Sequence, residues 1–298
     1  MTHALPRSEN LTGILLMIAS MALFGVEDMF LKWAAAGLPI GQIIFVSGAF
    51  GMPVFVLMAW RQGQRVWVKE ALQPAVLARN FGEMVGTAGY VAALATVPLS
   101  TVSAVLQAMP LVVTMGAALC YREQVGWRRW SAIAVGFAGV LVVIRPGAEG
   151  FRPEALWVLV TVAGLGLRDL ASRAIPASVT TAQVSAWGLA SVTLLGVLMM
   201  AVSGEVRAVS AWQGLVLLGA VAFGTAGYWA ITAATRTGEV SVVAPFRYTR
   251  LIFAIVIGAL VFGEWPDRFT YLGAALIIGS GLYSFARERF RKRASQPG

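Results

Sequence analysis

The sequence Gly-Thr-Ala-Gly-Tyr occurs at residues 86–90 and again at residues 224–228, 138 positions later. Other residues recur at an offset of 141, and these pairs are Gly25 and Gly166, Asp28 and Asp169, Lys32 and Arg173, Gln42 and Gln183, and Glu123 and Glu264. The chain therefore consists of two copies of one unit. We place them at residues 1–148 and 149–298, the second with a basic C-terminal tail.

The composition of both copies is that of a protein dissolved in lipid. Hydrophobic residues make up 58% of the chain and charged residues 12%, and the mean hydropathy is +0.75. Soluble domains carry roughly 25% charged residues. A helix that crosses a bilayer needs about 20 apolar residues. Ten stretches meet this requirement, so we predict an all-α membrane protein with spans at residues 11–31, 40–60, 76–97, 100–119, 128–145, 154–174, 179–202, 211–235, 239–262 and 268–287.

The distribution of basic residues predicts the orientation of these spans. Of the 23 Lys and Arg residues, 15 lie in segments on the same side as the N-terminus, five lie on the other side and three lie within spans. Basic loops stay in the cytoplasm, so we expect both termini there. Each copy has five helices, an odd number, so the second copy enters from the opposite side. Two inverted five-helix repeats can enclose a central site and expose it alternately to either side.

Two arginines lie inside the ninth span, where a charge needs a specific reason. Arg247 and Arg250 are three residues apart and share a helix face near the membrane centre. An arginine there can hold a substrate carboxylate through two parallel hydrogen bonds, or it can form an internal salt bridge. We expect Arg247 to pair with Glu83 of the third span and Arg250 to bind the substrate. Gln107 of the fourth span offers both donors and an acceptor.

Aromatic residues and prolines near the middle of spans complete this predicted site. A tyrosine hydroxyl or an indole N–H in the membrane needs a partner or water, so such residues either line a cavity or pack between helices. The aromatic candidates are Tyr90, Tyr228, Tyr248 and Trp187. Proline removes a backbone donor from a helix and frees a carbonyl group. We therefore expect helix hinges at Pro110 and Pro245.

Acidic and basic residues near the ends of two repeat-related helices are candidates for gating or coupling. Asp28 and Lys32 are four residues apart, as are Asp169 and Arg173, which predicts one ion pair on each helix. These pairs are either structural bridges or gates, one on each side of the membrane. A buried carboxylate can also carry a proton, and the candidates are Glu27 and Glu83. The repeat partner of Glu27 is Arg168, so these two cannot perform the same task.

Motifs late in each copy resemble a known family. The first copy has Pro110, then Tyr-Arg-Glu at residues 121–123, followed by Trp130, Gly136 and Gly139. The second has Phe-Gly-Glu at residues 262–264, followed by Tyr271, Gly273 and Gly279. This pattern resembles the drug/metabolite transporter superfamily, in particular its ten-helix exporters built from two EamA-type repeats. The chain departs from it in having Arg122 before the first acidic residue, where a glycine is usual.

Within that superfamily the chain is most similar to bacterial exporters of aromatic and other neutral amino acids. The resemblance implies export of amino acids through the inner membrane, from a central cavity between the two halves. Two alternative substrates stay open: lipophilic cations or drugs, which would use carboxylates and aromatic rings, and sugar phosphates. A passive channel is a further alternative. Proton coupling also stays open.

Other classes of function lack the residues they need. His3 is the one histidine, so we expect no zinc site, and no glycine-rich loop with a lysine is present to bind ATP. We therefore predict neither an enzyme nor a bound metal or cofactor. The basic residues are scattered over short loops, which argues against nucleic-acid binding. The expected partners are a small-molecule substrate and membrane lipid, and we infer no obligate protein partner.

Overall fold

The computed structural model describes residues 7–148, 151–176 and 178–294, and this part of the chain is built of helices without strands. The first repeat contains α1 (Arg7–Ala35), α2 (Ile40–Arg61), α3 (Pro74–Thr96), α4 (Leu99–Leu106), α5 (Met109–Cys120) and α6 (Trp127–Ile144). The second contains α7 (Leu156–Ser172), α8 (Thr181–Ser203), α9 (Ala211–Thr237), α10 (Val240–Val243), α11 (Arg250–Phe262) and α12 (Arg268–Ala294). Short 3₁₀ segments are η1 (Lys69–Leu72), η2 (Pro153–Ala155) and η3 (Ala244–Thr249).

The number of membrane spans agrees with the sequence prediction. In the described residues, nine helical segments are long and apolar enough to cross a membrane. The tenth is α3, which is 23 residues long and carries Arg79, Asn80 and Glu83. The all-α fold with two repeats is therefore confirmed. The expected repeat boundary at residues 148 and 149 and the end of the basic tail at residues 295–298 fall partly outside the described residues.

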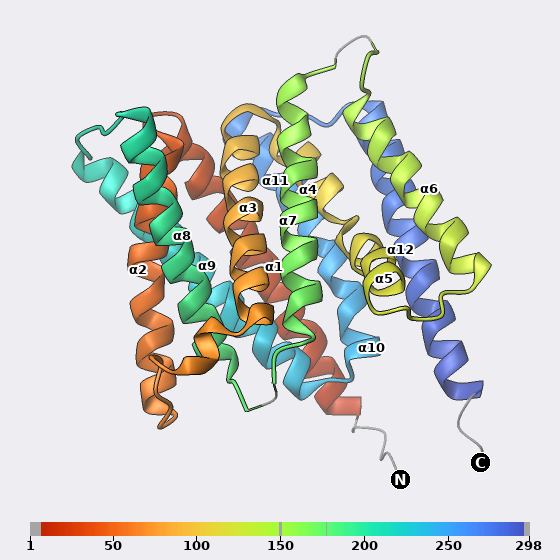
Figure 1. The fold of residues 1–298 in the computed structure, drawn as a ribbon. Helices are drawn as coiled ribbons and strands as arrows, with labels where there is room; N and C mark the ends of the chain where they lie inside the picture. The colour runs from red at the N-terminus through yellow and green to blue at the C-terminus, as the bar shows by residue number, and fades with distance from the viewer. Residues whose placement is uncertain (1–6, 149–150, 177, 295–298) are drawn as a thin grey trace.

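The two repeats interlock, because most helices pack chiefly against a helix of the other repeat. α1 packs along α9 and its repeat equivalent α7 packs along α3, while α2 pairs with α8 and α6 pairs with α12. Figure 1 shows α2 and α8 at one side of the molecule and α6 and α12 at the other. Figure 1 shows that α1 and α7 run in opposite directions. The start of α1 and the end of α12 lie at the same end of the molecule.

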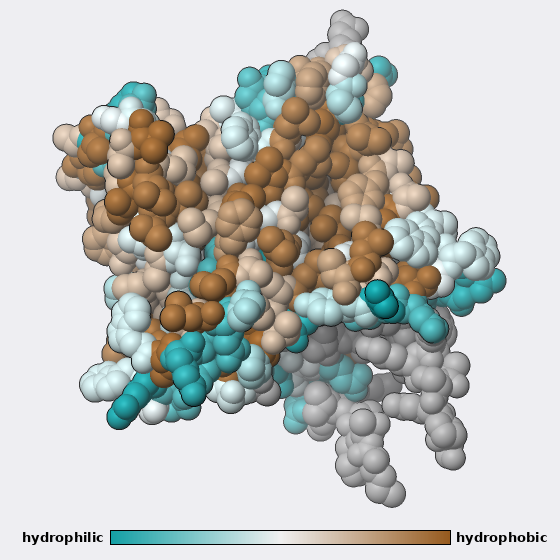
Figure 2. Space-filling model, in the orientation of Figure 1, coloured by the Kyte–Doolittle hydropathy of each residue, from teal (hydrophilic) through white to brown (hydrophobic). Residues whose placement is uncertain are grey.

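The repeated Gly-Thr-Ala-Gly-Tyr segment provides the close contact between these helices. A Cβ atom on Gly164 of α7 would lie 2.7 Å from the Gly86 Cα of α3, and one on Gly89 would lie 2.8 Å from the Trp157 carbonyl oxygen. In the second repeat, Gly227 of α9 packs against the ring of Phe24 in α1. Small residues allow membrane helices to approach this closely. The outer surface suits lipid: Figure 2 shows hydrophobic residues across the middle of one face.

The Arg122 departure from the family pattern coincides with an unusual backbone conformation. Arg122 has a φ of 54°, and its repeat equivalent Gly263 has a φ of 66°. Both follow the last turn of a helix, and the next amide N–H closes that turn, from Glu123 to Ala117 and from Glu264 to Gly258. This is a common helix ending in which glycine is favoured. The first repeat thus places an arginine where the backbone favours glycine.

Candidate functional site

The fourth and ninth spans are both interrupted near their middle. α4 stops at Leu106 and α5 starts at Met109, whereas the ninth span passes from α10 through η3 into α11. Pro110 and Pro245 lie at these interruptions, where neither has a backbone N–H to donate. The interruptions touch, because the Gln107 amide Nε2 donates to the Tyr248 carbonyl at 3.2 Å. These residues are 141 positions apart, so the contact joins equivalent points of the two repeats.

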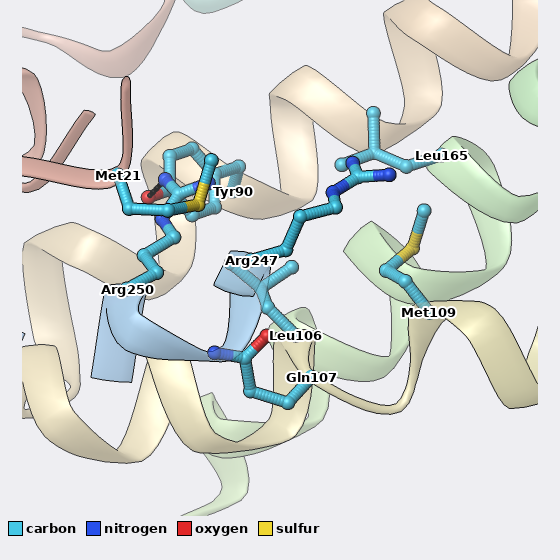
Figure 3. A pocket seen from close by; sticks show the side chains of 8 residues that line it. All are labelled: Met21, Tyr90, Leu106, Gln107, Met109, Leu165, Arg247 and Arg250. Carbon is cyan, nitrogen blue, oxygen red and sulfur yellow. Dashed lines mark hydrogen bonds between the residues drawn. The ribbon is translucent and has the colours of Figure 1, made fainter. Parts of the chain in front are cut away.

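A cavity of about 130 Å³ opens beside the interruptions. Figure 3 shows the side chains that line it, which come from α1, α3, α4, α5, α7 and the ninth span: Met21, Tyr90, Leu106, Gln107, Met109, Leu165, Arg247 and Arg250. Four of the candidate residues therefore meet at one cavity, namely Arg247, Arg250, Gln107 and Tyr90. The apolar members were not singled out from the sequence, since Met and Leu carry no signal that separates a cavity wall from ordinary packing.

Arg250 forms a tight network with two neighbouring helices. Its guanidinium donates to both carboxylate oxygens of Asp28, at 2.9 and 3.0 Å, and to the Tyr90 hydroxyl at 2.8 Å. Tyr90 in turn donates to Asp28. The Arg250 guanidinium also lies over the ring of Phe24, 5.3 Å from the ring centroid. Asp28 is only 1% exposed, so its charge depends on Arg250 for compensation.

A second network occupies the interface of α3 and α7. Glu83 pairs with Arg79 at 2.8 Å and with Arg168 at 3.3 Å, and Arg168 also pairs with Asp169 at 2.8 Å. The expected pairing of Glu83 with Arg247 is therefore wrong. Arg79 takes that place because it lies one helical turn before Glu83 on the same face, a spacing at which opposite charges meet. This spacing was readable from the sequence and was missed.

Arg247 differs from the other arginines inside the spans. Within the part of the chain that the structure describes, it makes no ion pair or hydrogen bond, and it is an exposed residue that lines the cavity. Arg168 and Arg250, the two other arginines counted within spans, each pair with a carboxylate, and so does Arg79, which the structure places in α3. Arg247 is therefore the arginine of the cavity wall that has no direct ion pair among the described residues. The expected roles of Arg247 and Arg250, one in a structural pair and the other open to the cavity, are exchanged in the structure.

The side chains of the other predicted aromatic residues are not among those that line the cavity. The Trp187 indole N–H donates to the Val66 carbonyl at 2.7 Å in a separate core cluster. Tyr228 accepts from Ser185 at 2.8 Å and packs edge-on against Phe55. The Tyr248 hydroxyl is buried against Gly281. None of these three side chains lines this cavity, and their contacts are those of packing between helices.

The predicted ion pairs within α1 and α7 are also wrong. Lys32 pairs with Glu264 at 2.7 Å, and Arg173 pairs with Glu123 at 2.9 Å. Both partners are related by the 141-residue offset, so the same ion pair occurs twice, each time between the two repeats. Lys32 is in the last turn of α1 and Arg173 follows the last residue of α7. Figure 1 shows that these two helices end at opposite ends of the molecule. The repeated glutamate was the sequence signal that could have identified these partners.

The Lys32–Glu264 pair is more deeply buried than the Arg173–Glu123 pair. Its side chains are 13% and 23% exposed, against 47% and 50% for the other pair. Lys32 also donates to the Val97 carbonyl, and Glu264 accepts from the Leu99 amide at 2.9 Å. These contacts fasten the end of α1 to the start of α4 and to the segment between α11 and α12.

The loop before α12 adds a further contact at this end. Asp267 pairs with Arg145 at 2.6 Å and accepts from the Thr270 amide and hydroxyl. Partial burial raises the pKa of the Asp267 carboxyl, but the hydrogen bonds from Thr270 and the Arg145 guanidinium outweigh it, so the pKa is lowered. The carboxylate is therefore charged at neutral pH and holds the loop to α6.

Comparisons with known proteins agree with this architecture. The EamA-like transporter family matches twice, at residues 11–145 and 152–285. The chain belongs to the EamA-like transporter family. It is a multi-pass membrane transporter, and this family membership supports the expectation that the protein is not an enzyme. A solved crystal structure with 19% sequence identity covers 95% of the chain and 99% of its own, with a TM-score of 0.61. That similarity concerns the fold alone.

Relatives of this EamA protein are named for different substrates. A riboflavin transporter of Rhizobium johnstonii is 28% identical over 70% of the chain and 68% of its own length. An S-adenosylmethionine uptake transporter of Rickettsia felis is 24% identical over 96% of the chain and 97% of its own length. A pseudopaline exporter of Pseudomonas aeruginosa is 26% identical over 90% of the chain and 93% of its own length. The names include both uptake and export.

Proposed function

We propose that this transporter exports neutral and aromatic amino acids across the bacterial inner membrane by alternating access, with both termini in the cytoplasm. The observation that carries the proposal is Arg247, an arginine that lines the cavity and forms no ion pair with a carboxylate among the described residues. The planar guanidinium group matches a carboxylate through two parallel hydrogen bonds. A substrate carboxylate supplies the missing negative charge.

The charge balance of the cavity favours a single carboxylate over the alternative substrates. Arg250 is neutralised by Asp28, so one positive charge is left at Arg247. A phosphate group brings a charge of about −1.5 to −2 at neutral pH, which exceeds that single charge. A lipophilic cation would meet Arg247 without a free carboxylate on the cavity wall. The single carboxylate of an amino acid matches the one charge of Arg247, and S-adenosylmethionine, the named substrate of one relative, itself ends in an amino-acid group.

A carrier is favoured over a passive channel by the repeat-related ion pairs. The Lys32–Glu264 and Arg173–Glu123 pairs connect helices at opposite ends of the molecule. Opening one pair while the other stays closed exposes the cavity to one side at a time, as alternating access requires. These pairs replace Asp28 and Asp169 as the proposed gates, since Asp28 is held by Arg250 and Asp169 by Arg168.

Glu27 is the proposed site of proton coupling. Glu83 has two arginine partners, whereas Glu27 forms no ion pair or hydrogen bond in the described residues and packs against Gly224. A carboxylate within the membrane that lacks such a partner is suited to bind a proton. Glu27→Gln is expected to keep the exchange of substrate between the two sides and to lose accumulation driven by a pH gradient. Full gradient-driven accumulation by this variant would exclude Glu27.

The main experiment measures uptake by proteoliposomes of leucine, of 4-methylpentanoate, which lacks the amino group, and of 3-methylbutylamine, which lacks the carboxylate. We expect saturable transport of leucine and none of the amine. Hydrogen bonds to a charged group contribute about 1.5–3 kcal/mol, so Arg247→Ala is expected to weaken leucine affinity by about 10- to 150-fold. Arg236→Ala, which removes an exposed arginine from the last turn of α9, is the matched control. Unchanged leucine affinity in Arg247→Ala would refute the proposal, and flux that does not saturate would indicate a channel.

A further inference from the structure

The amide group of Gln107 has a defined orientation. Its nitrogen donates to the Tyr248 carbonyl, and because a carbonyl only accepts, the amide oxygen must point elsewhere. Figure 3 shows this oxygen on the side of the amide nearer to Leu106 and Arg247. Gln107 is 7% exposed and lines the cavity. Its side-chain oxygen has no hydrogen-bond donor among the described residues, so it is an acceptor that is open to a ligand.

The end of α4 places a second acceptor beside this oxygen. The last residue of α4 is Leu106, and Pro110 follows four positions later. In a continuous helix the residue at that position would donate to the Leu106 carbonyl, but proline has no N–H. The carboxyl end of a helix also carries a partial negative charge. Leu106 and Gln107 thus bring negative potential to the part of the cavity wall formed by the interrupted fourth span.

We propose that the Gln107 side-chain oxygen and the carbonyl end of α4 form a binding site for a primary ammonium group. This inference rests on the proposed function and deepens it, because the ammonium group is the α-amino group of a substrate whose carboxylate binds Arg247. Interrupted membrane helices provide such carbonyl groups for cations. The site contains no carboxylate of its own. An amine without a carboxylate therefore meets Arg247 without compensation, whereas a zwitterion satisfies both parts of the cavity.

The two repeats differ at the cavity in a way that agrees with separate sites for the carboxylate and the ammonium group. The repeat equivalents of Arg247 and Arg250 are Leu106 and Met109, which are apolar. All positive charge on the cavity wall therefore comes from the second repeat, while the free amide oxygen comes from the first. A ligand with a negative and a positive end would lie across the contact between the repeats, with each end bound to a different one.

The experiment compares binding of leucine and 4-methylpentanoate to the full-length protein in detergent, by calorimetry. The wild type is expected to bind leucine at least tenfold more tightly. Gln107→Met removes the acceptor at similar side-chain length, so it should weaken leucine binding at least tenfold and change 4-methylpentanoate binding less than twofold. Gln107→Glu retains an acceptor and is expected to keep the preference for leucine.

The outcomes separate this inference from the proposed function. Equal loss of both ligands in Gln107→Met would assign Gln107 a structural role through Tyr248 and overturn the inference. Equal affinity of the wild type for both ligands would overturn it even if no variant folds, and would leave a carboxylate transporter in place. Binding of neither ligand by folded wild-type protein would refute the proposed function and this site together.

Discussion

Removal of Arg250 tests whether the Asp28 network stabilises the interface of the two repeats. Arg250→Met deletes two hydrogen bonds to Asp28, at 2.9 and 3.0 Å, and one to Tyr90 at 2.8 Å. Asp28 is 1% exposed, so water cannot replace the guanidinium. Breaking a buried ion pair by removing one partner costs about 3–5 kcal/mol, and we expect a loss of that size in the free energy of unfolding.

The second variant separates the lost charge from lost packing. Asp28→Asn in the Arg250→Met background removes the uncompensated carboxylate, so most of the stability should return. Unfolding can be followed by tryptophan fluorescence in mixed detergent micelles, since the chain has ten tryptophans, with Arg236→Ala as the control. A loss below about 1 kcal/mol in the single variant, or no recovery in the double variant, would refute the reasoning.

Three further predictions concern residues outside the cavity. Arg122→Gly should raise thermal stability by about 1 kcal/mol, because glycine accepts the positive φ that Gly263 has in the other repeat; an unchanged or lower stability in a thermal scan would contradict this. Lys32→Glu places two carboxylates together, so substrate exchange in proteoliposomes should fall, and adding Glu264→Lys should restore it if the pair acts as a unit. The pKa of the Asp267 carboxyl is lowered on folding. Its contribution to folding stability is therefore fully present above the carboxyl pKa of the unfolded chain, and it is lost as the pH falls through the carboxyl pKa of the folded protein. In Asp267→Asn the free energy of unfolding should therefore fall less steeply at acid pH than in the wild type. The difference should be below about 1 kcal/mol, because this carboxylate is 42% exposed.

The ten spans were predictable because each depends on local composition. An apolar stretch of about 20 residues has few alternatives to a membrane helix, and the structure places every expected span within a few residues. The interruptions at Pro110 and Pro245 were also predictable, since proline removes a backbone hydrogen bond wherever it falls in a helix. These features are decided by residues close together in the sequence.

The ion pairs were harder to predict because they depend on which helices touch. Asp28 lies 222 positions from its partner Arg250, and spacing along α1 suggested Lys32 instead. The four-residue spacing indicates only that two residues share a helix face, whereas a buried charge pairs with whatever the neighbouring helix presents. The repeat offset contained the missing information for Lys32 and Glu264, because their equivalents Arg173 and Glu123 form a second charged pair between the repeats.

The contact between Gln107 and Tyr248 has a further consequence for the transport cycle. These residues are equivalent in the two repeats, so the pseudo-two-fold axis passes between them, beside the cavity. Inverting such a carrier would give two identical states if the halves were alike, but arginine on one side of the axis faces leucine on the other. In the proposed alternating-access cycle, the inward-facing and outward-facing states would thus differ in energy and in ligand affinity, and the carrier would be intrinsically asymmetric.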